Sequence, residues 1–269
     1  MTVENEQPAP NNESDLLAEG KTQFINVAPY YDLLMSDVPY ENWVTYLKEL
    51  LEERHAKPRR ILDLACGTGN VTELFAAEGF VMTGVDIASD MIAAAKSKAE
   101  SKQLEIPYYV QDAAELDLPG EKFDLCICLF DSLNYILEPD RLAMAMERVA
   151  SHLTRKGLFI FDMNTEYALK NHFFDQSNRM SDVRLRYDWK SSYSHDTRLC
   201  KVSMKFWFRG EDEIERVFEE EHLQFAYRME EVLSMLTNAG FRHFKTYQAY
   251  TFRAPSRSCD RVFFVAQLG

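Results

Sequence analysis

The sequence has little of what marks disordered, secreted or membrane-spanning chains. It holds ten glycines and nine prolines among 269 residues, too few for a low-complexity or collagen-like chain. No apolar run approaches the roughly 20 residues that a membrane helix needs. The first 20 residues contain no lysine or arginine, so we expect neither a signal peptide nor a transit peptide. These absences predict a cytoplasmic protein that does not enter a membrane.

Positive charge is also scarce, with 30 basic residues against 43 acidic ones and a net charge of −13. A field of that sign repels phosphate backbones, so we expect no broad nucleic-acid binding. The five cysteines, an odd number without a secretion signal, predict free thiols. Cys126 and Cys128 lie in an apolar run with a single residue between them, which is poor spacing for zinc. We therefore expect strand packing there and no metal site.

From residue 60 onward, short apolar strands alternate with amphipathic helices. This rhythm is typical of an α/β fold with a mostly parallel sheet covered on both faces. Two helices precede it, over 24–35 and 40–51, and two closing strands that should pair antiparallel cover 241–252 and 261–267. The other expected strands cover 60–64, 80–85, 106–110, 123–129 and 157–163.

Residues 180–227 break this rhythm. Apolar and polar residues alternate there with period two, which predicts a three-stranded antiparallel insertion. We expect the main domain to comprise 21–179 and 228–269, with 1–20 as a disordered tail. The insertion would act as a substrate lid, or as a dimer surface because Trp207 interrupts its polar face.

The clearest motif follows the first strand, where residues 63–70 have the sequence DLACGTGN. Glycines between a strand and a helix allow a tight turn, and the helix N-terminus offers free N–H groups to a ligand. Asp86 ends the second strand, 19 residues after Gly67, where a carboxylate can accept hydrogen bonds from both hydroxyls of a ribose. Asp112 ends the third strand, and the backbone of Ala113 could bind the edge of an adenine. The pattern indicates an adenosine-bearing cofactor.

The same region disfavours a nicotinamide dinucleotide. The dinucleotide fingerprint needs a third glycine where Thr72 stands. Asp63 lies inside the strand before the turn, where it can fix the N–H groups of the loop and sit near an ammonium group. Ser89 offers an N-cap for the next helix, which would leave Asp86 available to a ligand.

Together, residues 63–69 (DLACGTG), 83–86 (TGVD) and 111–113 (QDA) resemble the binding motifs of class I S-adenosylmethionine-dependent methyltransferases. Further matches, such as residues 30–32 (YYD) and 131–135 (DSLNY), resemble a bacterial subgroup of small-molecule methyltransferases. The resemblance implies a Rossmann-like, seven-stranded sheet with an antiparallel last strand, and S-adenosylmethionine as the cofactor.

The resemblance also implies roles for single residues. Asp86 would hold the ribose, Leu129 would lie beneath the reactive sulfur, and Tyr31 would cover the cofactor. The full set of cofactor-binding residues implied is Tyr31, Asp63, Ala65, Gly67, Gly69, Asp86, Ile87, Met91, Asp112, Ala113 and Leu129.

Candidates for the acceptor side are Asn134 and Tyr135 after the fourth strand and His222 in the insertion. Transfer of a methyl group is an in-line displacement, for which the protein supplies alignment and a dry pocket, with a general base when the nucleophile is an oxygen. Asn134 could equally cap the chain, and His222, beside three glutamates, could equally be a solvated strand residue.

The expected function is methyl transfer to a nitrogen or oxygen of a small-molecule acceptor. Two alternatives stay open: a methyltransferase acting on tRNA or protein, and a module that binds S-adenosylmethionine without transfer. A homodimer also stays open.

Overall fold

The computed structural model describes residues 23–24, 26–180 and 183–269, so the tail expected over 1–20 lies outside it. Its centre is a seven-stranded sheet with strand order β10-β11-β5-β4-β1-β2-β3. Strand β11 runs antiparallel to both neighbours, and the other pairs are parallel. This arrangement confirms the predicted Rossmann-like fold. The strands are β1 (Arg60–Leu64), β2 (Val81–Asp86), β3 (Tyr108–Val110), β4 (Phe123–Cys128), β5 (Leu153–Asn164), β10 (Phe241–Gln248) and β11 (Arg261–Leu268).

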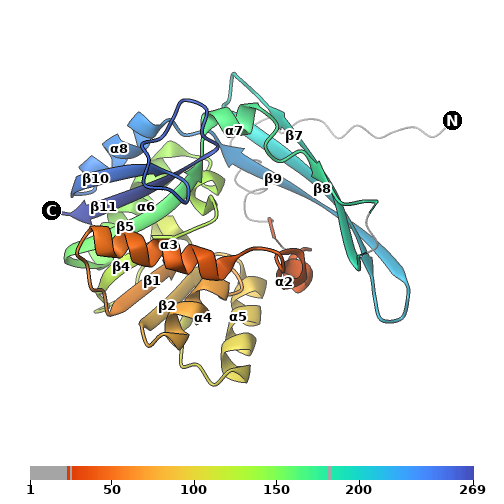
Figure 1. Cartoon of the computed structure of the whole chain (residues 1–269), viewed down its shortest axis with the longest axis horizontal. Coiled ribbons are helices and arrows are strands. Elements are labelled where there is room, and N and C mark those ends of the chain that lie inside the picture. The colour runs from red at the N-terminus through yellow and green to blue at the C-terminus, as the bar shows by residue number, and fades with distance from the viewer. Residues whose placement is uncertain (1–22, 25, 181–182) are drawn as a thin grey trace.

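Helices cover both faces of this sheet. One face packs against α3 (Tyr40–Glu53) and α4 (Asn70–Ala77), and Figure 1 shows α3 crossing in front of the strands. The other face packs against α6 (Pro139–His152) and α8 (Met229–Asn238). Because β1 lies in the middle of the sheet and is covered on both faces, the turn that follows it is held at a rigid edge.

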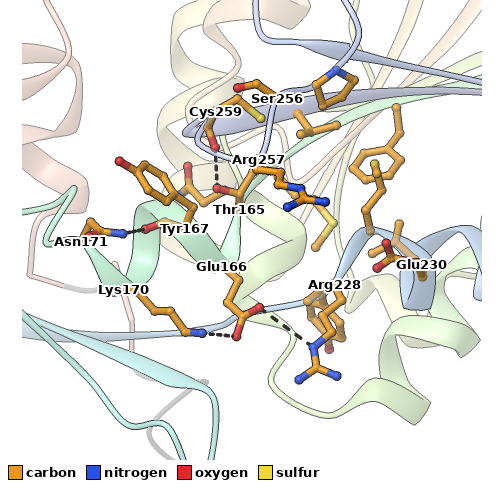
Figure 2. A pocket seen from close by; sticks show the side chains of 18 residues that line it. Thr165, Glu166, Tyr167, Lys170, Asn171, Arg228, Glu230, Ser256, Arg257 and Cys259 are labelled. Carbon is orange, nitrogen blue, oxygen red and sulfur yellow. Dashed lines mark hydrogen bonds and ion pairs between the residues drawn. The ribbon is translucent and has the colours of Figure 1, made fainter.

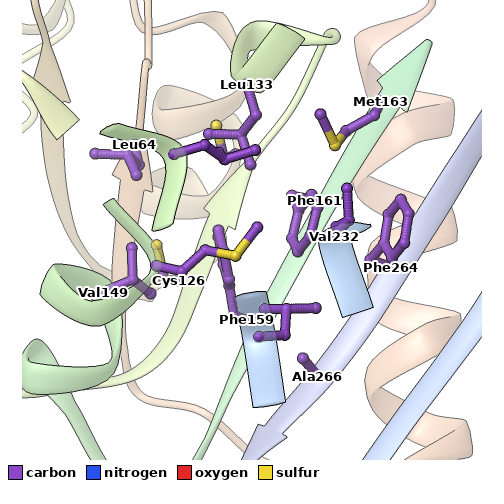
Figure 3. Close-up of a cluster of buried hydrophobic side chains, with 14 of the residues drawn as sticks. Leu64, Cys126, Leu133, Val149, Phe159, Phe161, Met163, Val232, Phe264 and Ala266 are labelled. Carbon is purple, nitrogen blue, oxygen red and sulfur yellow. The ribbon is translucent and has the colours of Figure 1, made fainter. Parts of the chain in front are cut away.

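Figure 3 shows the core on the α6 and α8 face. The rings of Phe161 and Phe264 stack there with centroids 4.8 Å apart, which joins β5 to the antiparallel strand β11. Cys126 and Cys128 are fully buried in β4, which confirms that they serve strand packing. At the sheet edge, α5 (Ser89–Ser101) packs on Tyr108 of β3.

The insertion has four strands, so the expectation of three is corrected. The added strand, β6 (Gln176–Ser177), lies just before the expected start of the insertion at residue 180. It has two residues and pairs with Asp188 and Trp189, too little for a pattern to reveal. The sheet order is β6-β7-β8-β9, and Figure 1 shows it projecting from the main sheet. Its longer strands are β7 (Leu185–Tyr193), β8 (Leu199–Arg209) and β9 (Glu215–Phe225).

The first expected helix, over 24–35, is shorter and broken. Residues Ala28–Tyr30 form a 3₁₀ turn, η1, with Pro29 near its start, and α2 covers only Tyr31–Leu34. Phe24 has a left-handed φ of 67°, which a continuous helix could not contain. Within the described residues, no helix is both long and apolar enough to cross a bilayer.

Candidate cofactor and acceptor site

The turn between β1 and α4 is tight, with positive φ at Ala65 (57°), Gly67 (54°) and Gly69 (80°). An added Cβ at Gly67 would meet no atom within 4 Å, whereas one at Gly69 would lie 2.5 Å from the Tyr108 hydroxyl. Gly67 therefore borders open space that a ligand can fill, and Gly69 allows the turn to pack against β3.

Asp86, at the end of β2, is tied to this turn. Its Oδ2 accepts the N–H of Gly67 at 2.7 Å, and its Oδ1 accepts the N–H of Ala88 at 2.9 Å. Burial raises the pKa of Asp86, although these two hydrogen bonds oppose the shift. Ala88 is the N-cap residue of α5 and has no side-chain cap bond, so the expectation that Ser89 caps this helix is wrong. The Asp86 carboxylate itself accepts one backbone N–H at the start of that helix, the N–H of Ala88.

Asp63 lies beneath the turn, inside β1. Its carboxylate is 4% exposed and accepts a hydrogen bond from the Thr72 hydroxyl of α4 at 2.5 Å. Burial raises its pKa to about 7, and the Thr72 hydrogen bond only partly offsets this. Among the described residues no cation pairs with Asp63, and a buried acid of this kind is electrostatically suited to a cationic ligand nearby.

The short helix α2 is fixed above the turn through Asp32. Its Oδ1 accepts hydrogen bonds from Thr68 Oγ1 at 2.6 Å and Asn70 Nδ2 at 3.1 Å, and its Oδ2 pairs with Lys98 Nζ at 2.9 Å. Burial alone would raise the pKa of Asp32, but the hydrogen bonds from Thr68 and Lys98 lower it overall. The Asp32 contacts, which the sequence did not reveal, thus fix the helix that carries Tyr31 to the residues of the glycine turn.

A cavity of about 980 Å³ opens at this edge of the sheet, between the glycine turn, the N-terminal segment before α3 (residues 23–24 and 26–39) and the insertion. Its volume is at the upper end of the ~300–1,000 Å³ usual for ligand pockets. Three buried carboxylates, those of Asp63, Asp86 and Asp131, line it together with the guanidinium of Arg261. The predicted site residues that line it are Tyr31, Asp63, Ala65, Gly67, Asp86, Ile87, Met91, Leu129, Tyr135 and His222.

Four predicted site residues do not line this cavity: Gly69, Asp112, Ala113 and Asn134. The carboxylate of Asp112 accepts the Ala114 N–H at 2.9 Å and pairs with Arg141 at 2.6 Å, so it caps a short 3₁₀ turn, η2 (Ala113–Glu115). A role of Asp112 and Ala113 at an adenine edge stays a proposal.

Asn134 is completely buried in η3 (Ser132–Tyr135) and its amide is occupied by backbone groups. Its Nδ2 donates to the carbonyls of Asn164 and Phe225 at 3.2 and 3.0 Å, and its Oδ1 accepts the Asn164 N–H at 3.0 Å. These bonds tie η3 to β5 and β9, which favours the capping alternative over contact with a substrate.

The loop after β4 is held by a charge network that the sequence reading missed. Phe130 and Asp131 have left-handed φ values of 65° and 51°, and the Asp162 carboxylate accepts both of their N–H groups, at 2.7 and 3.0 Å. Arg261 of β11 bridges Asp162 and Asp131 at 2.5 and 2.6 Å. Burial raises the pKa of Asp131 to about 6 although Arg261 opposes the shift. The only sequence signal was an acid inside the apolar strand β5.

His222 is 1% exposed, so the alternative that it is a solvated strand residue is wrong. Its Nε2 lies 2.8 Å from Glu220 Oε2 and its Nδ1 lies 3.3 Å from the Tyr135 hydroxyl. Burial raises the pKa of Tyr135. The structure thus brings two of the three predicted catalytic residues together on the cavity wall, with a buried glutamate behind them.

A second hollow, of about 520 Å³, lies between α7 (Glu166–Lys170), the start of α8 and the loop before β11. Figure 2 shows Glu166 reaching toward Lys170 and Arg228, with Nζ and Nε at 2.6 and 4.0 Å. None of the predicted site residues lines it. Glu166 pairs there with both cations, and the cofactor motifs lie at the larger cavity.

Comparison with known proteins shows that this chain is similar to methyltransferases. A family model described as a methyltransferase domain matches residues 61–157. The Bacillus subtilis (strain 168) protein named "Putative methyltransferase YqeM" is 32% identical over 240 residues, which cover 89% of this chain and 95% of that protein. A Geobacillus sp. (strain WCH70) protein with the same general description is 34% identical over 242 residues, covering 89% and 97%.

Solved structures agree. An S-adenosylmethionine-dependent methyltransferase from Clostridium acetobutylicum ATCC 824 superposes with a TM-score of 0.81 at 30% identity, covering 91% of this chain and 98% of that one. The chain belongs to the class I S-adenosylmethionine-dependent methyltransferases, in a group with these bacterial relatives. A sugar N-methyltransferase from Streptoalloteichus sp. ATCC 53650 shares the fold, with a TM-score of 0.69 at 20% identity, covering 100% and 97%.

Proposed function

We propose that this methyltransferase methylates a nitrogen or oxygen of a small molecule held inside the large cavity. The observation that carries the proposal is that one cavity is lined by the glycine turn and Asp86 on one side and by inward-facing aromatic residues of the insertion on the other. Its size suits a cofactor and a second small ligand together. S-adenosylmethionine, when bound, supplies the activated methyl group.

The cofactor half of the cavity is the rim of the main sheet. Gly67 leaves room for the cofactor, Asp86 offers carboxylate oxygens to a ribose, and Asp63 lies where a cationic group would offset its burial. Ile87, which is half exposed, and the buried Met91 would flank the adenine. Leu129 would support the reacting centre, Ala65 would contact the methionine portion, and Gly69 would shape the turn.

The acceptor half would lie beneath the insertion. Tyr187, Trp189 and Phe206 line the cavity from strands β7 and β8. Among the described residues, the buried indole N–H of Trp189 has no hydrogen-bond partner. A buried donor without a partner is costly, and an acceptor molecule with a suitable oxygen could satisfy it. This arrangement supports the interpretation of the insertion over 180–227 as a substrate lid.

The small-molecule acceptor is favoured over tRNA or protein. A macromolecule must bring its acceptor atom down to the methyl group, and residues of the N-terminal segment and of the insertion line this cavity opposite the glycine turn, which narrows the approach. The net charge of −13 further opposes tRNA. Two solved structures of the same fold are described as an amino pentose methyltransferase and a sugar N-methyltransferase, which is consistent with a small acceptor.

The test is incubation of the protein with methyl-labelled S-adenosylmethionine and separated fractions of a bacterial extract. We expect label in the small-molecule fraction, and mass spectrometry would identify the methylated atom. Label confined to the RNA or protein fraction would contradict the proposal. Tight cofactor binding with no transfer to any fraction would favour a binding module.

A homodimer through the outer face of the insertion is a separate proposal. Trp207 lies there, half-buried, with Arg179 and Lys205 at 5.1 and 5.9 Å from its ring. Light scattering on the wild type and on Trp207→Glu tests it. A dimer that becomes a monomer supports the interface, and a monomer in both samples contradicts it.

A further inference from the structure

The two carboxylate oxygens of Glu220 have different partners. Oε1 accepts the backbone N–H groups of Asn26 at 2.6 Å and Val27 at 2.9 Å. Oε2 faces Nε2 of His222 at 2.8 Å. Because an ionised carboxylate can only accept, the neutral His222 ring must carry its proton on Nε2. Its Nδ1 is then an acceptor, and that atom faces the Tyr135 hydroxyl.

The N-terminal segment covers this chain of contacts. The ring of Phe24 lies over both aromatic partners, with centroids 4.4 Å from His222 and 5.3 Å from Tyr135. Gln23 adds a hydrogen bond to the backbone N–H of Leu223 at 3.2 Å. Glu220 is 7% exposed. The contact between Glu220 and His222 is therefore shielded from water, which strengthens it, whereas Tyr135 stays partly exposed on the cavity wall.

We propose that Glu220 fixes His222 in the Nε2–H form so that the Tyr135–His222 pair takes the proton that the acceptor loses on methylation. The proposal rests on the proposed function and narrows its acceptor class. The acceptor atom must carry a proton, as in a primary or secondary amine or a hydroxyl group. A tertiary amine has no proton to give and would make no use of the pair.

Residues of this chain take up the proton that the acceptor loses. The acceptor atom gains a bond to the methyl carbon and loses its bond to hydrogen, while the carbon–sulfur electron pair stays on sulfur. The proton goes to the Tyr135 oxygen as the Tyr135 proton moves to His222 Nδ1. The resulting imidazolium, paired with the Glu220 carboxylate, carries the positive charge that the sulfur has lost. Glu220 acts as a positioning residue, and Tyr135 is the group that meets the acceptor.

The test reads the His222 tautomer directly and needs no acceptor. Nitrogen-15 NMR at about pH 8.5, where ordinary imidazoles are neutral, distinguishes Nε2–H from Nδ1–H rings. The chain has six histidines, so the signal is assigned by its loss in His222→Gln. We expect Nε2–H in the wild type. In Glu220→Gln, the amide oxygen should stay on the two backbone N–H groups, so the amide NH₂ faces Nε2 and the ring should switch to Nδ1–H.

Two further variants complete the test. Glu221→Gln changes an exposed glutamate in the same strand, and Tyr135→Phe removes only the hydroxyl; both should keep the Nε2–H form because Glu220 sets it. The proposal is overturned if the His222 ring of the wild type is in the Nδ1–H form. It is equally overturned if the ring of Glu220→Gln stays in the Nε2–H form. The two results are independent, so the test holds even if one variant folds poorly. A failure to methylate any small molecule would instead contradict the proposed function and leave the tautomer result standing.

Discussion

The carboxylate of Asp86 accepts the backbone N–H of Gly67 at 2.7 Å, which joins the ends of two neighbouring parallel strands. The carboxyl ends of parallel strands meet at one edge of the sheet, and ligands of such sheets bind there. This single hydrogen bond therefore orders both parts of the proposed cofactor site, the glycine turn and the acid.

Replacement of Asp86 by alanine should weaken binding of S-adenosylmethionine by about 1.5–3 kcal/mol, the scale of a hydrogen bond to a charged group. Isothermal titration calorimetry measures this. Asp90→Ala, an exposed acid nearby on α5, is the control and should leave the affinity unchanged. Equal affinities for the wild type and Asp86→Ala would remove Asp86 from the ribose site.

Gly69→Ala should destabilise the fold more than Gly79→Ala. Both glycines have left-handed φ, 80° and 92°, so each substitution costs about 1–2 kcal/mol of backbone strain. Only at Gly69 would the new Cβ also meet the buried Tyr108 hydroxyl, at 2.5 Å. Adding Tyr108→Phe should recover part of that excess. Chemical denaturation measures the three variants, and equal losses at both glycines would contradict the packing argument.

The pKa of Asp63, raised by burial to about 7, predicts a pH-dependent stability. In the unfolded chain this pKa is about 4, so the folded state binds the proton more tightly. The stability from Asp63 is thus fully present below about pH 4 and is lost as the pH rises through 7. The free energy of unfolding of Asp63→Asn should therefore rise relative to that of the wild type as the pH is raised from 5 to 8. Asp90→Asn is the control. If the free energy of unfolding of Asp63→Asn ran parallel to that of the wild type across this pH range, the raised pKa would be refuted.

Arg261→Met should lower the free energy of unfolding by about 3–5 kcal/mol, because it leaves the buried carboxylates of Asp131 and Asp162 without their cation. Adding Asp131→Asn should restore part of the loss. Arg253→Met, at an exposed position on the preceding loop, should have little effect. A loss no larger than that of this control would show that the network contributes little.

Much of the fold was predictable because burial repeats along the chain. The period-two alternation expected over 180–227 predicted which face of β8 is buried, and the structure confirms it. The helix over 24–35 was not predictable at its true length. Its hydrogen bonds and packing partners lie on the insertion and on the glycine turn, far away in sequence.

The acceptor side shows a different limit. The acidic run around Glu220 is typical of a solvated strand edge. A glutamate in such a run does not by itself show that it points into the protein. Period two places Glu220, His222 and Gln224 on the same face, and all three are buried. Their partners, Tyr135 and Asp131, come from the loop after β4, so only the folded chain reveals the pairing.

The most direct test of the central claim is a crystal structure of the protein grown with S-adenosylmethionine. We predict the ribose hydroxyls within hydrogen-bonding distance of Asp86, the backbone of Gly67 against the cofactor, and the methyl group facing Tyr135 across the large cavity. Cofactor density in the second hollow beside Glu166, or a cofactor that does not touch Asp86, would contradict the account.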